Sequence, residues 1–533
     1  MLVDADTPPL NDLVANGIAV RDMKHAEKYI DDVWRSVEKE FPPEFKYLGC
    51  ERCPFPEEYR ETIRKRTVRP SYDIAESNFY MVKYYFSFKG EKLKPKYIYL
   101  PYVTENCTIH ISNGRYLVSP VLADRVISIG LNYVFIRLLR DRMTFEKLNH
   151  HFKVDDVRET VSVVWSNVYH KTEQMKKLKN PLSKMKCTLA HYLFCKYGYT
   201  EAMQRFAHTT PVVGDHTTID VHQYPPDQWV ICKSNQTKPK GVGFGPWLPS
   251  NLRIAIRRED FERTRMAKNL TAGLFYVVDH FPEFFENPAN ANDSRWMMIL
   301  MGQIIWAPSV PYGRLQNDTA AHIASLDDYI DSIMIDKFKQ IEKPITDLYQ
   351  LFALLVDNFD QWLLDGADKV NSMYDKELNV IGFLLETLTF LIVRLNFRLK
   401  AAAKKELKLR DVENALQQVK QGALFSLVKT SGCLSTTSSP GDNKAFKLTT
   451  ILIPQTASQK GVGKSDRGST TDATKRLHVS VAEIGGYSNV PKSEPSGRAR
   501  LNPHVLLDEC GMVQRHEDLR ELLDQVESQI KRL

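Results

Sequence analysis

Residues 79–102, FYMVKYYFSFKGEKLKPKYIYLPY, hold nine aromatic side chains and five lysines in 24 positions. Aromatic residues make up 10% of the whole chain, so this stretch is strongly enriched in rings. Aromatic-rich runs are typical of half-buried β-strands whose lysines form the solvated face. Rings interleaved with ammonium groups also suit single-stranded nucleic acid, because bases stack on rings while lysines neutralise phosphates. The stretch predicts strands, and both roles of its surface stay open.

The sequence on either side of this stretch combines helical and strand signals. Apolar residues of 26–37 recur at helical spacing, which predicts an amphipathic helix. Two alternating runs, 108–112 and 115–118, flank Asn113-Gly114, a dipeptide that favours a hairpin because both positions tolerate positive φ. We therefore predict an α+β N-terminal domain over residues 1–155.

The next part of the chain predicts a mixed helical and loop-rich domain over residues 156–320. The pattern of 126–177 is mostly helical, and 182–206 is typical of a further helix. Prolines and glycines are frequent in 208–250, which indicates a connector or an irregular β segment.

The third part, residues 321–430, carries the clearest helical signal. Apolar stripes at 326–341 and 345–359 are separated by Pro344, and a long helix is predicted from Leu378. Consecutive amphipathic helices of this kind indicate a helical bundle.

The last part, residues 431–533, begins with an abrupt shift to Ser, Thr, Gly and Lys. It contains a predicted strand at 446–453 and ends in a helix with an apolar stripe from Leu519 to Leu533, which offers a contact for oligomerisation. The expected fold class is thus α+β and multidomain, with a mixed β/helical N-terminal half, a central helical bundle and a loop-rich β C-terminal region ending in a helix.

Composition narrows the compartment and the partners. The formal net charge of +7 permits a polyanionic partner. The most apolar window, 380–393, is too short to span a bilayer and contains Glu386, so no membrane contact is predicted. Most of the eight cysteines stand singly, which favours reduced thiols in a cytoplasm.

No catalytic residue and no cofactor is predicted. Residues 458–465, SQKGVGKS, end like a phosphate-binding P-loop, but Ser458 replaces the first glycine and a poor helix former follows. The chain contains no GxSxG or HExxH motif, so covalent catalysis is unsupported. Whether the protein is an enzyme stays uncertain, and a non-catalytic role is favoured.

One cluster carries ligand types suited to a divalent metal. Asp220 and His222 would share a face of a strand, and His216 would be a third ligand. An acidic run between Asp318 and Asp336 is open to the same interpretation. Carboxylates and histidines in loops also cap turns and meet water, so both interpretations are kept.

Basic residues make a more consistent pattern. Lys400, Lys404 and Lys408 would line up at i, i+4 and i+8 on one helix, where they repel one another unless an anion is near. Affinity for a phosphate backbone accumulates over several contacts. The predicted nucleic-acid-binding residues are Tyr84, Lys94, Lys96, Tyr97, Tyr99, Lys238, Lys240, Arg394, Arg398, Lys400, Lys404, Lys408, Arg498 and Arg500.

Three segments, SPVLADRV at 119–126, SLDDYID at 325–331 and PSGRARLNP at 495–503, resemble parts of large uncharacterised proteins of tailed-bacteriophage genomes. The resemblance implies the infected bacterial cytoplasm or the virion and transfers no active-site residue.

The expected function is a non-catalytic accessory protein that binds nucleic acid, single-stranded in preference, in a phage replication or transcription assembly. Its partners are then nucleic acid or other phage proteins. The first alternative is a virion structural or assembly protein. The second is a metal-dependent enzyme of nucleic-acid metabolism.

Overall fold

The chain folds into two compact units, each with helices and antiparallel sheets, which confirms the α+β multidomain class. One unit contains residues 1–125 and 368–533, and the other contains residues 126–367. The computed structural model describes residues 11–66, 77–130, 132–139, 141–179, 181–235, 250–369, 372–403, 406–427, 433–436, 448–452, 480, 484, 498–502, 505–509, 511–515 and 517–530.

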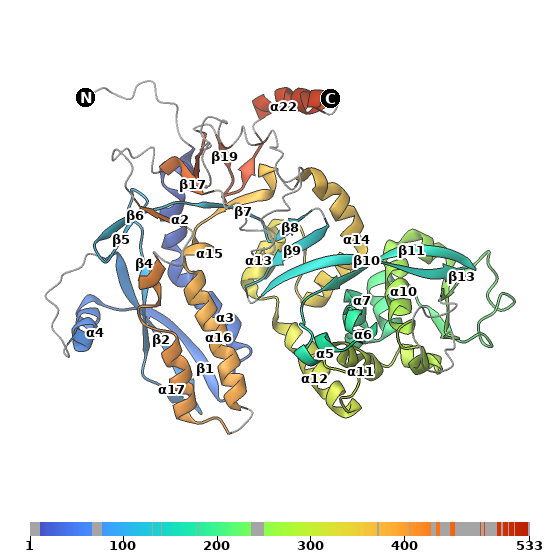
Figure 1. The fold of residues 1–533 in the computed structure, drawn as a ribbon. Helices are drawn as coiled ribbons and strands as arrows, with labels where there is room; N and C mark the ends of the chain where they lie inside the picture. The colour runs from blue at the N-terminus through green and yellow to red at the C-terminus, as the bar shows by residue number, and fades with distance from the viewer. Residues whose placement is uncertain are drawn as a thin grey trace. The chain divides into compact units, whose positions relative to one another are not determined.

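The discontinuous unit is organised around the predicted aromatic strands (Figure 1). Its first sheet pairs β2 with β1, β3 and β4, and α3 packs on one face through Trp34, which is fully buried. The rings of Tyr84 and Phe86 lie against Trp34 at centroid distances of 6.1 and 5.0 Å. The strands are β1 (Phe45–Arg52), β2 (Phe79–Phe88), β3 (Glu91–Lys92) and β4 (Lys96–Pro101), and the helix is α3 (Ala26–Glu38).

The predicted hairpin forms as β5 (Thr108–Ile111) and β6 (Gly114–Val118), but its turn is one residue earlier than expected. Ser112 and Asn113 have φ of 51° and 67°, and Gly114 pairs with Ile111 as part of the strand. The remaining strands of this unit are β7 (Val121–Asp124), β15 (Lys376–Asn379), β16 (Leu434–Thr436), β17 (Thr450–Leu452), β18 (Arg498–Arg500), β19 (Leu506–Leu507) and β20 (Val513–Gln514).

Helices of this unit come from both ends of the chain. The helix predicted from Leu378 begins later, because Leu378 pairs with Leu122 in β15 and β7. The helices are α1 (Asp12–Ala15), α2 (Ile18–Lys24), α4 (Phe55–Arg66), α15 (Ile381–Leu384), α16 (Glu386–Ala403), α17 (Leu409–Gln418) and α22 (Glu517–Ile530), with short 3₁₀ turns at Met373–Asp375 and Ala423–Ser426. The terminal helix was predicted, and α22 confirms it.

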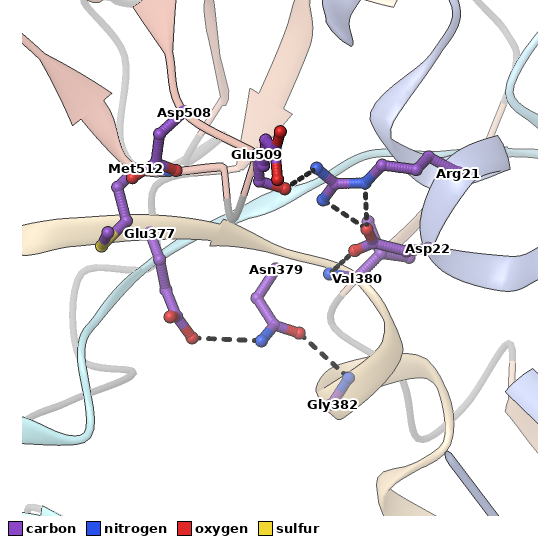
Figure 2. Close-up of polar contacts among 9 residues, drawn as sticks. All are labelled: Arg21, Asp22, Glu377, Asn379, Val380, Gly382, Asp508, Glu509 and Met512. Carbon is purple, nitrogen blue, oxygen red and sulfur yellow. Dashed lines mark hydrogen bonds and ion pairs between the residues drawn. The ribbon is translucent and has the colours of Figure 1, made fainter. Parts of the chain in front are cut away.

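A polar cluster ties three distant segments of this unit together (Figure 2). The carboxylate of Asp22 accepts from the Arg21 guanidinium and, at 3.1 Å, from the backbone N–H of Val380. Arg21 also donates to the carbonyl of Glu509 at 2.7 Å. Burial raises the pKa of Asp22, while Arg21 opposes that shift. The cluster thus fastens α2 to the start of α15 and to the turn after β19.

The continuous unit holds a seven-stranded sheet in the order β12-β14-β13-β10-β9-β8, with β11 paired to β10. The prediction of mostly helical structure for 126–177 is wrong, because the long hairpin of β10 and β11 occupies most of it. Asp155 and Asp156 form its turn with φ of 47° and 67°, so no glycine marks the turn. The strands are β8 (Ile127–Ile129), β9 (Tyr133–Arg137), β10 (Arg142–Val154), β11 (Val157–Ser166), β12 (Val212–Gly214), β13 (Trp229–Ser234) and β14 (Arg253–Arg257).

Helices fill the rest of this unit. The helix predicted over 182–206 is broken at Gly198, which has a φ of 78°. A side chain at this position would place its Cβ 2.5 Å from the carbonyl oxygen of Asn292, so only glycine fits. The helices are α5 (Glu173–Lys177), α6 (Pro181–Lys184), α7 (Leu189–Tyr197), α8 (Tyr199–Ala202), α9 (Arg258–Arg263), α10 (Arg265–Val278), α11 (Ser294–Ile305), α12 (Tyr312–Ser325), α13 (Ser332–Gln340) and α14 (Leu348–Lys369), with a π-helical turn at Met203–Ala207 and 3₁₀ turns at Pro282–Phe285, Pro288–Ala291 and Leu326–Asp328.

The two units differ from the four predicted domains. The predicted boundary between residues 155 and 156 falls in the β10–β11 turn, and the predicted bundle of 321–430 contributes helices to both units. The four-domain division stays a prediction. In the part of the chain that the structure describes, no helix is long and apolar enough to cross a bilayer.

Candidate nucleic-acid interface

Helix α16 presents a solvent-facing surface of alternating rings and guanidinium groups. Its opposite face is buried through Leu388, Ile392, Leu395 and Leu399. The residues at the exposed positions are Phe390, Arg394, Phe397 and Arg398, which we call the α16 face. Their spacing of i, i+4, i+7 and i+8 places all four on one side of the helix. Phe390 and Phe397 are 60% and 65% exposed, so both rings are available to a partner.

The charges on α16 fall into two classes. Neither Arg394 nor Arg398 forms an ion pair with any residue that the structure describes, and both are exposed. Lys400 instead contacts the carboxylate of Glu40 and is thereby neutralised within the fold. Arg394 and Arg398 thus have no counter-charge among the described residues, whereas Lys400 has one.

The predicted lysine stripe on one helix does not form. Helix α16 ends at Ala403, and Lys408 is the N-cap of the next helix, α17, so Lys400 and Lys408 belong to different elements. Lys404 lies outside the described residues. Helix α17 packs beside α16 (Figure 1), and it begins with three exposed residues, Lys408, Leu409 and Arg410.

The aromatic strands are placed as predicted, but one predicted contact residue is inaccessible. Tyr84 is fully buried beneath α3, so its ring cannot stack on a base, and we remove it from the interface. Burial raises its pKa well above the ordinary value for tyrosine. Lys96 pairs with Tyr84 across β2 and β4 and shares its face of the sheet.

The other face of the sheet carries Lys83, Tyr97 and Tyr99, and helix α4 lies against it through polar contacts. Lys83 and Tyr97 both donate to the carboxylate of Glu57, at 3.0 and 2.9 Å. Hydrogen bonds from Lys83 and then from Tyr97 lower the pKa of Glu57. Burial, followed by the bond to Glu57, raises the pKa of Tyr97 to about 12. These half-buried tyrosines are engaged within the fold.

The remaining predicted basic residues lie apart from the α16 face in the sequence. Lys94 is exposed in the link between β3 and β4. Arg498 and Arg500 belong to β18, and Arg500 is exposed. Lys238 and Lys240 lie outside the described residues, as does the P-loop-like segment 458–465.

The weak metal candidates form turns instead of a ligand set. Asp220 and His222 were expected on one face of a strand, but the carboxylate of Asp220 accepts from the backbone N–H groups of His222 and Gln223, each at 2.9 Å. These backbone bonds lower the pKa of Asp220. His216 is exposed in the same loop. Among the described residues, no group of three or more His, Cys, Asp or Glu side chains could hold a metal ion.

The acidic run is likewise occupied by structural contacts. Asp327 pairs with Lys196 at 2.7 Å, and Asp331 caps α13 by accepting from the N–H of Met334 at 3.0 Å. These contacts use the carboxylates as solvated or capping groups. They leave the metal-dependent alternative without geometric support in the described chain.

A buried polar cluster in the other unit was missed by sequence reasoning. The Ser234 hydroxyl donates to one carboxylate oxygen of Asp279 at 2.5 Å, and His150 Nε2 lies 3.4 Å from the other. Burial raises the pKa of Asp279 to about 7 and lowers that of His150 to about 3, so both are neutral at intermediate pH. Ser234 donates to the carboxyl group and not to the imidazole, so it is not arranged as an activated nucleophile.

The two phenylalanines of the α16 face were also missed. Their signal is present in the sequence, because Phe390 and Phe397 fall outside the apolar stripe that α16 buries.

Comparison with known proteins gives one family. The sequence model of a family described as non-virion RNA polymerase subunit matches residues 4–527, which is nearly the whole chain. No curated protein matches the sequence.

Proposed function

Because the chain belongs to the family of non-virion RNA polymerase subunits, we propose that it is a non-catalytic accessory subunit that contacts nucleic acid within a viral transcription assembly. A subunit of this kind associates with the other proteins of the polymerase. The polymerase family favours transcription over replication among the predicted assemblies.

The observation that carries nucleic-acid contact is the α16 face. Guanidinium groups bind phosphates through several donors held in a fixed plane, and arginine is weakly hydrated, so little is lost on contact. Exposed rings between them offer stacking surfaces that accept any base. Arg394 and Arg398 lack ion-pair partners among the described residues, and a phosphate backbone would supply them.

Single-stranded nucleic acid suits this surface better than duplex. Stacking on Phe390 and Phe397 needs unpaired bases, which a duplex does not present. Lys408 and Arg410, at the start of the adjacent α17, extend the basic surface. We keep Lys94, Lys96, Tyr97, Tyr99, Lys238, Lys240, Lys404, Arg498 and Arg500 as further proposed contacts.

The family also bears on the source and on the alternatives. A non-virion polymerase subunit is a viral protein of the infected cell, and its description gives no support to a virion structural role. We propose a tailed-bacteriophage source and the bacterial cytoplasm, on the three segments that resemble phage proteins. Leu522 and Ile530 of α22 are exposed, which supports a contact between α22 and another chain.

Purification tests the proposal directly. The protein should carry nucleic acid that raises its absorbance ratio at low salt and is released at high salt, because phosphate contacts are salt-dependent. Tagged protein from infected cells should also bring down polymerase subunits. A protein that binds neither single-stranded nor double-stranded DNA or RNA at low salt would overturn the nucleic-acid role.

A further inference from the structure

Helix α4 lies on the first sheet with its polar side inward and its rings outward. Phe55 and Tyr59 are 77% and 58% exposed and stack on each other with centroids 6.1 Å apart. No side chain described in α4, from residue 55 to residue 62, is buried. A surface helix of a globular protein normally buries its apolar stripe. The described part of α4 is thus held by polar groups and not by a hydrophobic contact.

We call three of the hydrogen bonds that hold α4 to the sheet the α4 latch. Glu57 accepts from Lys83 Nζ at 3.0 Å and from the Tyr97 hydroxyl at 2.9 Å. The hydroxyls of Thr62 and Tyr99 lie 2.6 Å apart. A polar ligand with acceptor and donor groups can take over these bonds, because such an exchange swaps one set of hydrogen bonds for another.

The sheet face under the latch has the chemistry of a single-strand-binding surface. Lys83 pairs with Tyr97 across β2 and β4, and Met81 pairs with Tyr99, so both tyrosines and the lysine share one face. Tyr85, two residues from Lys83, lies on the same face. The Tyr99 ring already packs on Phe425 at a centroid distance of 5.2 Å. Lys83 would therefore supply one phosphate contact, and Tyr85 and Tyr97 the stacking rings.

Glu57 occupies the place that an anionic ligand would take on this face. Its two carboxylate oxygens accept from an ammonium group and from a phenol, the same donors that hold phosphate oxygens. Lys83 is only 9% exposed while the latch is closed, and it also lies 3.5 Å from Glu51. The lysine is therefore hidden while α4 stays in place, and it is paired with a carboxylate from α4, Glu57, and with one from β1, Glu51.

We propose that the face formed by Lys83, Tyr85 and Tyr97 is a second binding surface for single-stranded nucleic acid, which α4 keeps closed by placing Glu57 where a phosphate would bind. This inference rests on the proposed function, and it adds a regulated site to the exposed α16 face. Binding of a strand at the latch displaces α4.

The test is a gain of affinity in a variant with a weakened latch. Glu57→Gln with Thr62→Val should bind an oligothymidylate more tightly than the parent, by about tenfold, because an apparent dissociation constant falls as the open fraction rises. Adding Lys83→Gln and Tyr97→Leu should abolish the gain. Glu91→Gln is the matched control, since it removes an exposed carboxylate from β3 of the same sheet without touching the latch.

Hydrogen exchange supplies a second readout on the unmodified protein. Saturation with the oligonucleotide should speed amide exchange in α4 if the strand displaces it. Unchanged affinity in the latch variant, or slower exchange in α4 on binding, overturns this inference while leaving binding through the α16 face intact. A parent that binds no nucleic acid overturns the proposed function instead, and binding gained only by the latch variant supports the second surface alone.

Discussion

Replacing Arg394 and Arg398 by Gln should weaken nucleic-acid binding without a preference for sequence. Both side chains are exposed and unpaired among the described residues. Each would therefore displace counterions from the nucleic acid when it contacts a phosphate. Each lost contact removes about 0.7 from the slope of log K against log salt on single strands, and about 0.9 on duplex. The double variant should therefore lose about 1.4 on single strands and about 1.8 on duplex.

Fluorescence anisotropy of a labelled oligonucleotide over a series of salt concentrations measures this slope. Lys400→Gln is the matched control, because it removes a positive charge from the same helix. Lys400 already pairs with Glu40, so its loss should leave the slope unchanged and lower the melting temperature.

Phe390→Leu with Phe397→Leu separates stacking from charge. This variant should lose affinity for single strands by about 1–3 kcal/mol per stacked base and keep the parent slope, because stacking releases few counterions. Equal slope losses in the arginine variant and in the Lys400 control would refute the distinction between paired and unpaired charges. An unchanged slope in the arginine variant would refute phosphate contact at the α16 face.

Two further predictions address the other features. Between about pH 4 and 6.5 the parent protein binds one proton at the pair of Asp279 and His150 in both states. The proton is on the Asp279 carboxyl group in the folded state and on the His150 imidazole in the unfolded state. The pair therefore adds no pH dependence to the stability in this range. In Asp279→Asn only His150 still contributes to the pH dependence, and its lowered pKa should make stability rise with pH up to about 6.5, by as much as about 1.4 kcal/mol per pH unit relative to the parent. Urea unfolding at several pH values measures this difference. A difference between variant and parent that does not change with pH would contradict the prediction. Removal of the residues after His516 should leave the melting temperature unchanged, because Leu522 and Ile530 of α22 are exposed and not part of the core. It should reduce the mass measured by light scattering or the capture of polymerase subunits. Unaltered mass and unaltered capture would show that α22 is not a contact.

Local signals in the sequence were enough to predict the strands of 79–102, the helix α3 and the hairpin at Asn113, because each depends on neighbours in the chain. The exclusion of Tyr84 could not be predicted. Both faces of β2 carry rings, so the sequence shows no alternation that would tell the α3 face from the α4 face. Trp34 of α3, a residue about fifty positions away, covers the face of β2 that carries Tyr84.

The missed hairpin of β10 and β11 has a similar cause. A hairpin is recognised from its turn, and this turn uses two aspartates at positive φ in place of the expected Asn-Gly. The lysine stripe failed because the end of α16 at Ala403 carries no glycine or proline to signal it, and Lys408 is an atypical N-cap.

The number of basic residues in the sequence overstates the positive charge available to phosphate, because some of these residues are paired within the fold. Lys83 and Lys400 are each neutralised by a glutamate from a distant part of the chain, Glu57 and Glu40 respectively, which a count cannot anticipate. What distinguishes the α16 face is that its charges lack such partners in the described part of the chain and that its two rings lie off the buried stripe of the helix. A helix packs only one stripe into its own fold. The proposal of a ligand on α16 therefore rests on a second stripe of exposed rings, interleaved with arginines that are unpaired among the described residues.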